Sequence, residues 1–112
     1  LRAEAERQMD VYQVALTIHQ KPAPETIAIR RDIFVAASAA EADALKKQIA
    51  SRGYRGFNPE ALVIGDAESV ARQFDELGSL GYTDVIVRNL HPEYRDAILS
   101  TERLAQVIEI LS

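Results

Sequence analysis

The chain has 112 residues, 47% of them apolar, which is enough for one domain with a packed core. Lys and Arg number 13 against 17 acidic residues, and the formal net charge of -4 argues against a nucleic-acid or anionic-membrane surface. The sequence contains no cysteine, which excludes disulfides, thiol nucleophiles and zinc–thiolate sites from it.

The first residues indicate that the sequence begins inside a helix. Residues 1–4 have no initiator Met and none of the basic and apolar pattern of a signal peptide. No run approaches the roughly 18 apolar residues of a membrane span, and we expect a cytoplasmic protein. Apolar residues recur at helical spacing over residues 2–20, and the prolines at 22 and 24 end this helix.

The β-branched and aromatic residues of 27–36 predict a strand with a polar centre. Ser38 and Glu41 then form the sequence pattern of a capping box, in which each side chain satisfies a backbone N–H group of the other residue. We expect this helix to stop at Arg52 and Gly53, because glycine readily adopts the left-handed conformation of a helix end.

The second half of the chain repeats this alternation. Residues 62–64 form a short apolar run, and Asp66 is a good N-cap for the helix that follows. Gly78 and Gly81 close that helix, residues 83–88 read as a strand, and the last helix starts near His91 and Pro92. Strands that alternate with helices predict an α/β fold with parallel strands.

Two good strands and one short strand cannot close into a barrel, and they leave unpaired sheet edges. Four amphipathic helices are also many for so small a sheet. The shortfall is natural if residues 1–112 are a single partial domain, the C-terminal βα units of a TIM-type (β/α)8 barrel. We therefore expect an incomplete barrel and a truncated start.

Several segments resemble bacterial-luciferase-like, flavin-dependent monooxygenases. Residues 29–36, with the helix start at 40–42, resemble the seventh-strand region of that family. Residues 62–71 are similar to its "IG-x-x-E-x-V-A" helix, and residues 81–88 to its glycine stop and last strand. The family often has Ser/Thr-Pro after the glycine where this chain has Asp66-Ala67, and both sequences cap a helix. The resemblance spans essentially the whole chain.

This resemblance implies a barrel that binds a reduced flavin, FMN or a related deazaflavin, and oxidises a small organic substrate, often with molecular oxygen. Many flavin contacts of the family come from earlier strands, so we expect this chain to be inactive alone. The first competing hypothesis is a free-standing α/β binding or regulatory module that dimerises through its sheet. The second is a fragment that serves only as an oligomerisation surface. In each case a homo-oligomer is expected, because open sheet edges need a partner.

Four residues are candidates for the site, because catalytic groups of barrels lie at the carboxyl ends of strands. Arg88 is a candidate cofactor ligand for a phosphate or a flavin carbonyl. Asn89 and His91 are candidate catalytic residues, His91 as an acid or base. Ser38 is a second cofactor candidate, at a helix N-terminus that favours anions. No metal site is expected from the spacing of residues.

Each candidate also has a structural alternative. Arg88 can pair with a nearby carboxylate, and Asn89, His91 or Ser38 can cap a helix. Internal salt bridges are the default expectation for Arg30, Arg31 and Asp32. Residues 54–59 fit a mobile lid and a plain connection equally well.

Overall fold

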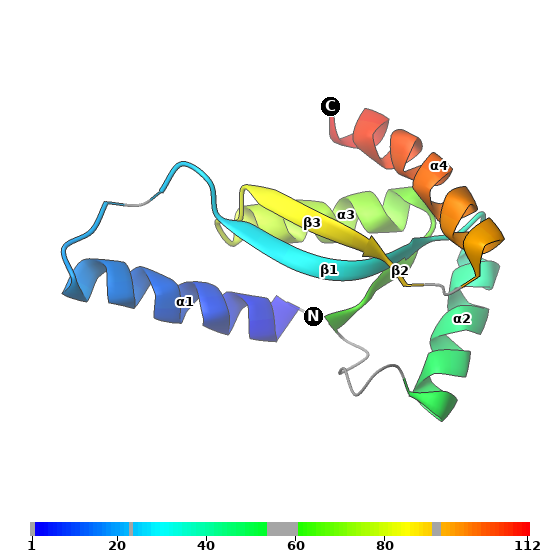
Figure 1. Cartoon of the computed structure of the whole chain (residues 1–112), viewed down its shortest axis with the longest axis horizontal. Helices are drawn as coiled ribbons and strands as arrows, with labels where there is room; N and C mark the ends of the chain where they lie inside the picture. The colour runs from blue at the N-terminus through cyan, green and yellow to red at the C-terminus, as the bar shows by residue number, and fades with distance from the viewer. Residues whose placement is uncertain (1, 23, 54–60, 91–92) are drawn as a thin grey trace.

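The alternation of helices and strands predicted from the sequence is confirmed in the computed structural model, which describes residues 2–22, 24–53, 61–90 and 93–112 (Figure 1). His91 and the expected lid at 54–59 lie outside these residues. In chain order the elements are α1 (Arg2–Ile18), β1 (Ala28–Val35), α2 (Ala39–Arg52), β2 (Val63–Gly65), α3 (Ala67–Ser79), β3 (Asp84–Asn89) and α4 (Tyr94–Leu111).

The three strands form one parallel sheet in the order β2-β1-β3. β3 pairs with β1 from Ala28 opposite Asp84 to Ile33 opposite Asn89, whereas β2 pairs only with residues 33–35. The expected parallel sheet is therefore confirmed. Consecutive strands of a (β/α)8 barrel are neighbours in chain order, so this sheet departs from three successive barrel strands. The reason is that β2, with three buried residues, joins the apolar end of β1.

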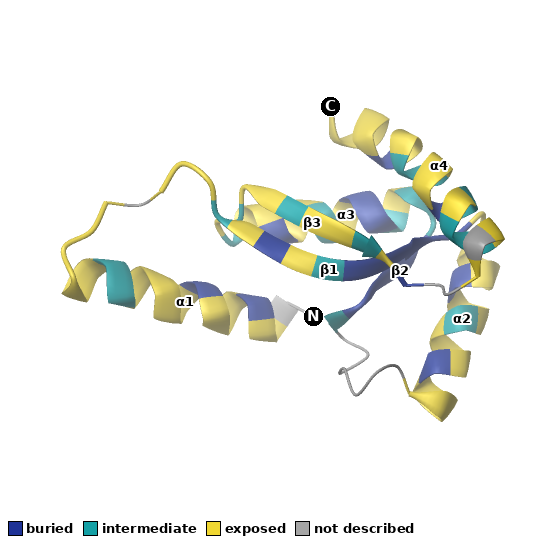
Figure 2. Ribbon diagram, in the orientation of Figure 1, coloured by how far each residue is buried: buried dark blue, intermediate teal, exposed yellow. Residues whose placement is uncertain are grey.

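Helices cover both faces of the sheet: α2 and α4 lie at its carboxyl end, whereas α3 runs back along it toward the amino end (Figures 1 and 2). Side chains alternate between faces along a strand. Phe34 and Ile64 point to one side, where they pack against α2, and this side is called the α2 face. Ile33 and Val63 point to the other side, where α3 and α4 pack, and this side is called the α3–α4 face.

The helix ends follow the local sequence signals. Asp66 Oδ1 accepts a hydrogen bond from Ser69 N at 2.9 Å, so the predicted N-cap of α3 is confirmed. Helix α2 ends at the predicted glycine, but Gly53 has φ 78° and ψ 172°, a positive-φ conformation outside the left-handed helical region that was expected. Gly81 has φ 111° and lies against Met9, whose Cε would be 3.2 Å from an added Cβ. A side chain at position 81 would therefore be strained and would also press on α1.

Helix α1 lies along the amino end of the sheet and uses only part of its apolar surface (Figure 1). Ala5 and Met9 are buried, and Tyr82 Oη donates a hydrogen bond to Ala5 O at 2.8 Å. Large apolar side chains on the rest of the helix are exposed: Val11, Val14 and Ile18. Among the described helices, none combines the length and apolar content that crossing a membrane requires.

Candidate functional site

The carboxyl ends of β1 and β3 lie side by side, because these strands are parallel neighbours. The sheet therefore brings Ser38, which follows β1, to the same end of the sheet as Arg88 and Asn89 of β3. The structure separates their roles, however, because consecutive residues of a strand point to opposite faces.

Ser38 caps α2 as its sequence pattern predicts. Its Oγ accepts a hydrogen bond from Glu41 N at 3.2 Å, and its backbone is extended. The other half of the predicted capping box does not form among the described residues: the Glu41 carboxylate turns from the Ser38 N–H to α4, where Arg103 Nη1 lies 3.4 Å from Glu41 Oε1. Because the cap already uses the Ser38 oxygen, the structural alternative accounts for this serine.

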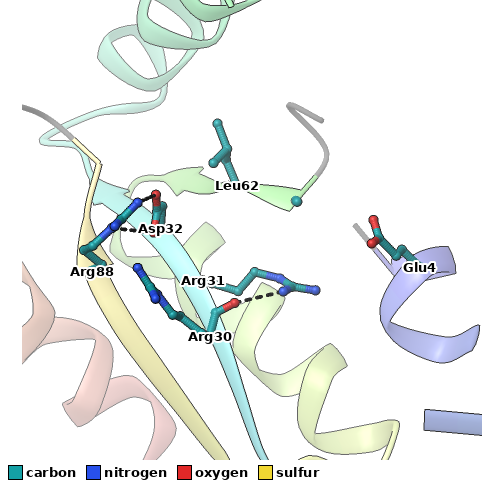
Figure 3. Close-up of a pocket in the computed structure, with 7 residues that line it drawn as sticks. Glu4, Arg30, Arg31, Asp32, Leu62 and Arg88 are labelled. Carbon is teal, nitrogen blue, oxygen red and sulfur yellow. Dashed lines mark hydrogen bonds and ion pairs between the residues drawn. The ribbon is translucent and has the colours of Figure 1, made fainter. Parts of the chain in front are cut away.

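Arg88 is held by Asp32, its register partner on β1 (Figure 3). Arg88 Nε donates to Asp32 Oδ1 at 3.0 Å, and Nη2 donates to Oδ2 at 2.7 Å. The side chain of Asp32 is 8% exposed and that of Arg88 is 38% exposed. A planar guanidinium that meets a carboxylate through two parallel hydrogen bonds has a fixed orientation. The expected internal salt bridge thus forms at Asp32, and it keeps the partly exposed edge of Arg88 at the surface of the α2 face.

Asn89 contacts the middle of α4 rather than its first turn. Asn89 Nδ2 lies 3.2 Å from Thr101 Oγ1, as donor to acceptor. The N-cap of α4 is Glu93, which makes no side-chain capping hydrogen bond. Asn89 therefore does not act as the helix cap that was one of its two predicted roles. It points to the α3–α4 face, whereas Arg88 points to the α2 face.

Two residues of α4 that the sequence reasoning missed hold the end of β1. Ser100 Oγ is buried and accepts a hydrogen bond from Val35 N at 2.9 Å. Arg103 Nη1 donates to Val35 O at 3.0 Å. A signal for Ser100 exists in the sequence, because it precedes Leu104 by four residues and Val107 by seven and so lies on the buried stripe of the helix. A serine in such a stripe indicates a backbone group that needs a partner.

A cavity of about 300 Å³ lies beside β1, close to the Asp32–Arg88 ion pair (Figure 3). Arginine and acidic side chains from β1, β3 and α1 line it, together with the two residues that precede β2: Glu4, Arg30, Arg31, Asp32, Ala61, Leu62 and Arg88. The sequence reasoning expected internal salt bridges for the charged centre of β1. It did not predict a cavity there.

Arg30 and Arg31 differ in their surroundings. Arg31 Nη1 donates to Arg30 O at 2.9 Å, and Arg31 Nε is buried without a hydrogen-bond partner among the described residues. Burial lowers the pKa of the Arg31 guanidinium below its usual value, against the opposing effects of Glu4 and Tyr82. The Arg30 side chain is exposed and makes no hydrogen bond or ion pair to the part of the chain that the structure describes. The expected salt bridges therefore do not extend to these two residues.

The described residues contain no group of three His, Asp or Glu side chains arranged to hold a metal ion. A search against protein-family models and a search of curated proteins found no match for this sequence. The geometry offers guanidinium groups, suited to anions, around the cavity beside β1, and an amide at the carboxyl end of β3.

Proposed function

We propose that this chain is part of a cytoplasmic flavin-dependent oxidoreductase of the bacterial-luciferase-like type, with β1 and β3 as the seventh and last strands of a (β/α)8 barrel. The observation that carries the proposal is the parallel pairing of β1 with β3, although α2, β2 and α3 lie between them in the chain. The sequence resemblance assigns the same two segments to the seventh and last strands, which are neighbours in a closed barrel.

The two faces of the β1–β3 pair support this assignment. Helices α3 and α4 pack on one face, as helices do on the outside of a barrel. The other face carries Asp32 and Arg88, which would then point to the interior, where the flavin binds. The position of α2 on the inner face has no counterpart in a barrel, so the proposal requires α2 to move when the earlier strands are present.

The proposed roles follow from the positions of the side chains. Arg88, oriented by Asp32, holds a phosphate or a carbonyl of FMN or a related deazaflavin by charge-assisted hydrogen bonds. Asn89 and His91 contact the flavin or a small organic substrate at the barrel rim, which requires the Asn89 side chain to turn from the α3–α4 face and to release Thr101. Ser38 serves as the cap of α2. Exposed apolar groups on α1 and α4 favour a homo-oligomer.

Flavin binding tests the proposal. The protein expressed from its complete reading frame should bind FMN saturably at one site per chain, followed by flavin fluorescence. The isolated 112-residue chain should not, because the other contacts would come from earlier strands. A reading frame that adds no barrel-sized extension, roughly 200 residues upstream, would contradict the proposal. So would a longer protein that folds but binds no flavin.

The role of Asn89 can be separated from its structural contact. Asn89→Ala in the complete enzyme should lower kcat/KM roughly tenfold, about 1.4 kcal/mol of transition-state stabilisation. Thr101→Ala is the matched control, because it removes the same hydrogen bond and leaves the amide in place. Equal kinetics for the two variants would show that Asn89 only positions α4.

A second candidate function is favoured by the strand order itself. The order β2-β1-β3, with α2 on one face and α3 and α4 on the other, is the arrangement of doubly wound α/β binding modules. In such folds the ligand binds outside the carboxyl ends of the strands, where the strand order reverses, here between β1 and β3. A short reading frame together with a stable fold of the 112-residue chain would favour this candidate over the barrel.

A further inference from the structure

The cavity beside β1 gathers three arginines in a chain whose net charge is -4 (Figure 3). Two carboxylates, those of Glu4 and Asp32, line the cavity with them. Asp32 already binds Arg88 through two hydrogen bonds, so the pair is close to neutral. The remaining side chains carry two positive charges against the single carboxylate of Glu4. The local balance therefore favours an anion, in contrast to the molecule as a whole.

We propose that this cavity, whose walls include Arg30, Arg31 and Arg88, binds a phosphate-class oxyanion. Arg30 is exposed and makes no side-chain hydrogen bond or ion pair to the described residues, so its guanidinium is available. A guanidinium presents donors in a planar fork that matches the oxygens of a phosphate. The inference does not rest on the proposed flavin function, because all of these residues belong to this chain and to the described part of it.

Arg31 provides the second, independent observation. Its Nη1 donates to Arg30 O, which leaves the edge formed by Nε and Nη2, and Nε is buried with no partner in the described residues. A buried donor without a partner is destabilising. Rotation of the side chain toward an oxyanion in the cavity would give Nε an acceptor. Binding would therefore relieve an unsatisfied group as well as neutralise charge.

The size and walls of the cavity limit the class of ligand. A volume of about 300 Å³ lies at the lower end of small-molecule sites and suits one phosphate group with a small organic part. Ala61 and Leu62 form an apolar wall against which such a part can pack. Free phosphate and a phosphate monoester present the same oxygens to the arginines, so the two must be compared directly.

Isothermal titration of the 112-residue chain with inorganic phosphate, at constant ionic strength, tests the inference. We expect saturable binding at one site, with a dissociation constant of about 1 mM. Arg30→Gln should weaken binding roughly tenfold or more, the loss of one charge-assisted contact. Arg72→Gln, an exposed arginine of α3 that does not line the cavity, is the matched control and should bind as the unchanged chain does.

Further variants distinguish a loss of phosphate binding from a failure of the chain to fold. Arg31→Gln should weaken binding as Arg30→Gln does, and Arg31→Lys should restore part of it because the charge returns. Arg30→Gln alone is decisive, because that side chain makes no hydrogen bond or ion pair to the described residues whose loss would unfold the chain. Asp32→Asn should strengthen binding, since it frees the Arg88 guanidinium from its carboxylate. Absence of saturable phosphate binding, or equal binding by Arg30→Gln and Arg72→Gln, would overturn the inference.

A second titration distinguishes free phosphate from a phosphate monoester as the ligand. Tighter binding of glycerol phosphate than of inorganic phosphate identifies a monoester as the ligand class, because only the monoester reaches the wall at Ala61 and Leu62. Equal affinities identify free phosphate. If FMN fails to bind the complete protein while inorganic phosphate still binds this cavity, the flavin proposal fails and the anion site stands.

Discussion

The two halves of β1 contain neighbouring residues of one strand but have different surroundings (Figure 2). In the carboxyl half, residues 33–35, every residue is buried. β2 pairs with all three of these residues, β3 pairs with Ile33 alone, and helices cover both faces. In the amino half, residues 28–32, exposed and buried residues alternate, and three of the five are charged. β3 pairs with the whole amino half, which β2 does not reach.

The difference shows that the charged residues at the centre of β1 lie where α2 and β2 stop covering the strand. They do not mark the end of the strand itself. A parallel strand covered on both faces is apolar along its length. Where α2 and β2 no longer reach, Arg30 and Asp32 replace the apolar residues, and a cavity lies beside them. The carboxyl half therefore supports the fold, and the amino half carries the groups that can bind a ligand.

The largest expected effect separates the two halves directly. Ile33→Ala, at a position with 0% exposure, should lower the free energy of unfolding by about 3 kcal/mol, the cost of a cavity in the core. Arg30→Ala, three residues earlier, should change it by less than about 0.5 kcal/mol. Urea unfolding of the two variants measures both values. Similar losses at the two positions would show that the division of β1 is wrong.

The ion pair at the boundary should have an intermediate effect. Asp32→Asn removes the carboxylate that binds Arg88, and we expect a loss of about 1–2 kcal/mol, less than for a fully buried pair because Arg88 is partly exposed. Unfolding of this variant, of Arg88→Gln and of the double variant gives the coupling between the two residues. A coupling energy near zero would mean that the pair contributes nothing to the sheet.

A smaller effect is expected at Ser38, which follows the carboxyl half of β1. Ser38→Ala removes the acceptor for Glu41 N and should cost about 1 kcal/mol of stability, as is usual for an N-cap. Phosphate binding in the cavity should not change, because Ser38 does not line it. A loss of phosphate affinity without a loss of stability would instead return Ser38 to the candidate ligands.

The smallest effect is expected at Tyr82, which packs on the amino half of β1 on the α3–α4 face. Tyr82 packs beside Ile29 and binds α1 through Ala5 O, and burial raises the pKa of its hydroxyl above its ordinary value, against the opposing effect of Arg31. Because the folded state disfavours the ionised form, the contribution of the Tyr82 hydroxyl to the free energy of unfolding is fully present below pH about 10. This contribution is lost as the pH rises through the folded pKa. Urea unfolding at pH 8 and pH 11 should show this loss.

Tyr82→Phe should remove that pH dependence, with Tyr12→Phe at an exposed position as the control. If Tyr82→Phe keeps the same decline between pH 8 and pH 11, another group is responsible for it.

The sequence predicts the elements well because their signals are local. Ser38, Asp66 and Gly53 occupy the helix ends assigned to them, and the apolar residues of β1 and β3 identify both strands. The strand order could not be predicted in this way. The position of β2 depends on which edge of β1 its three residues join, and no local residue encodes that choice.

Only part of the site could be predicted from the sequence, because several of its contacts depend on how the strands pair. A carboxylate partner was one of two predicted alternatives for Arg88, but its identity as Asp32 depends on the register of β1 against β3. Ser100 and Arg103 were missed because their partners are backbone groups of Val35, which the helical pattern does not reveal. The cavity was missed because it depends on where β2 begins.

Adjacent pairing of β1 and β3 underlies both the flavin proposal and the position of Arg88, and engineered cysteines test it most directly. The chain has no cysteine of its own, so Arg30→Cys with Ile86→Cys, register partners on the α2 face, introduces a single pair. Neighbouring strands lie about 4.8 Å apart, within the range that a disulfide bridges. The control pair, Ala28→Cys with Ile86→Cys, is offset by two residues. We predict rapid intramolecular disulfide formation for the first pair and not for the control, whereas equal rates, or only intermolecular bonds, would contradict the account.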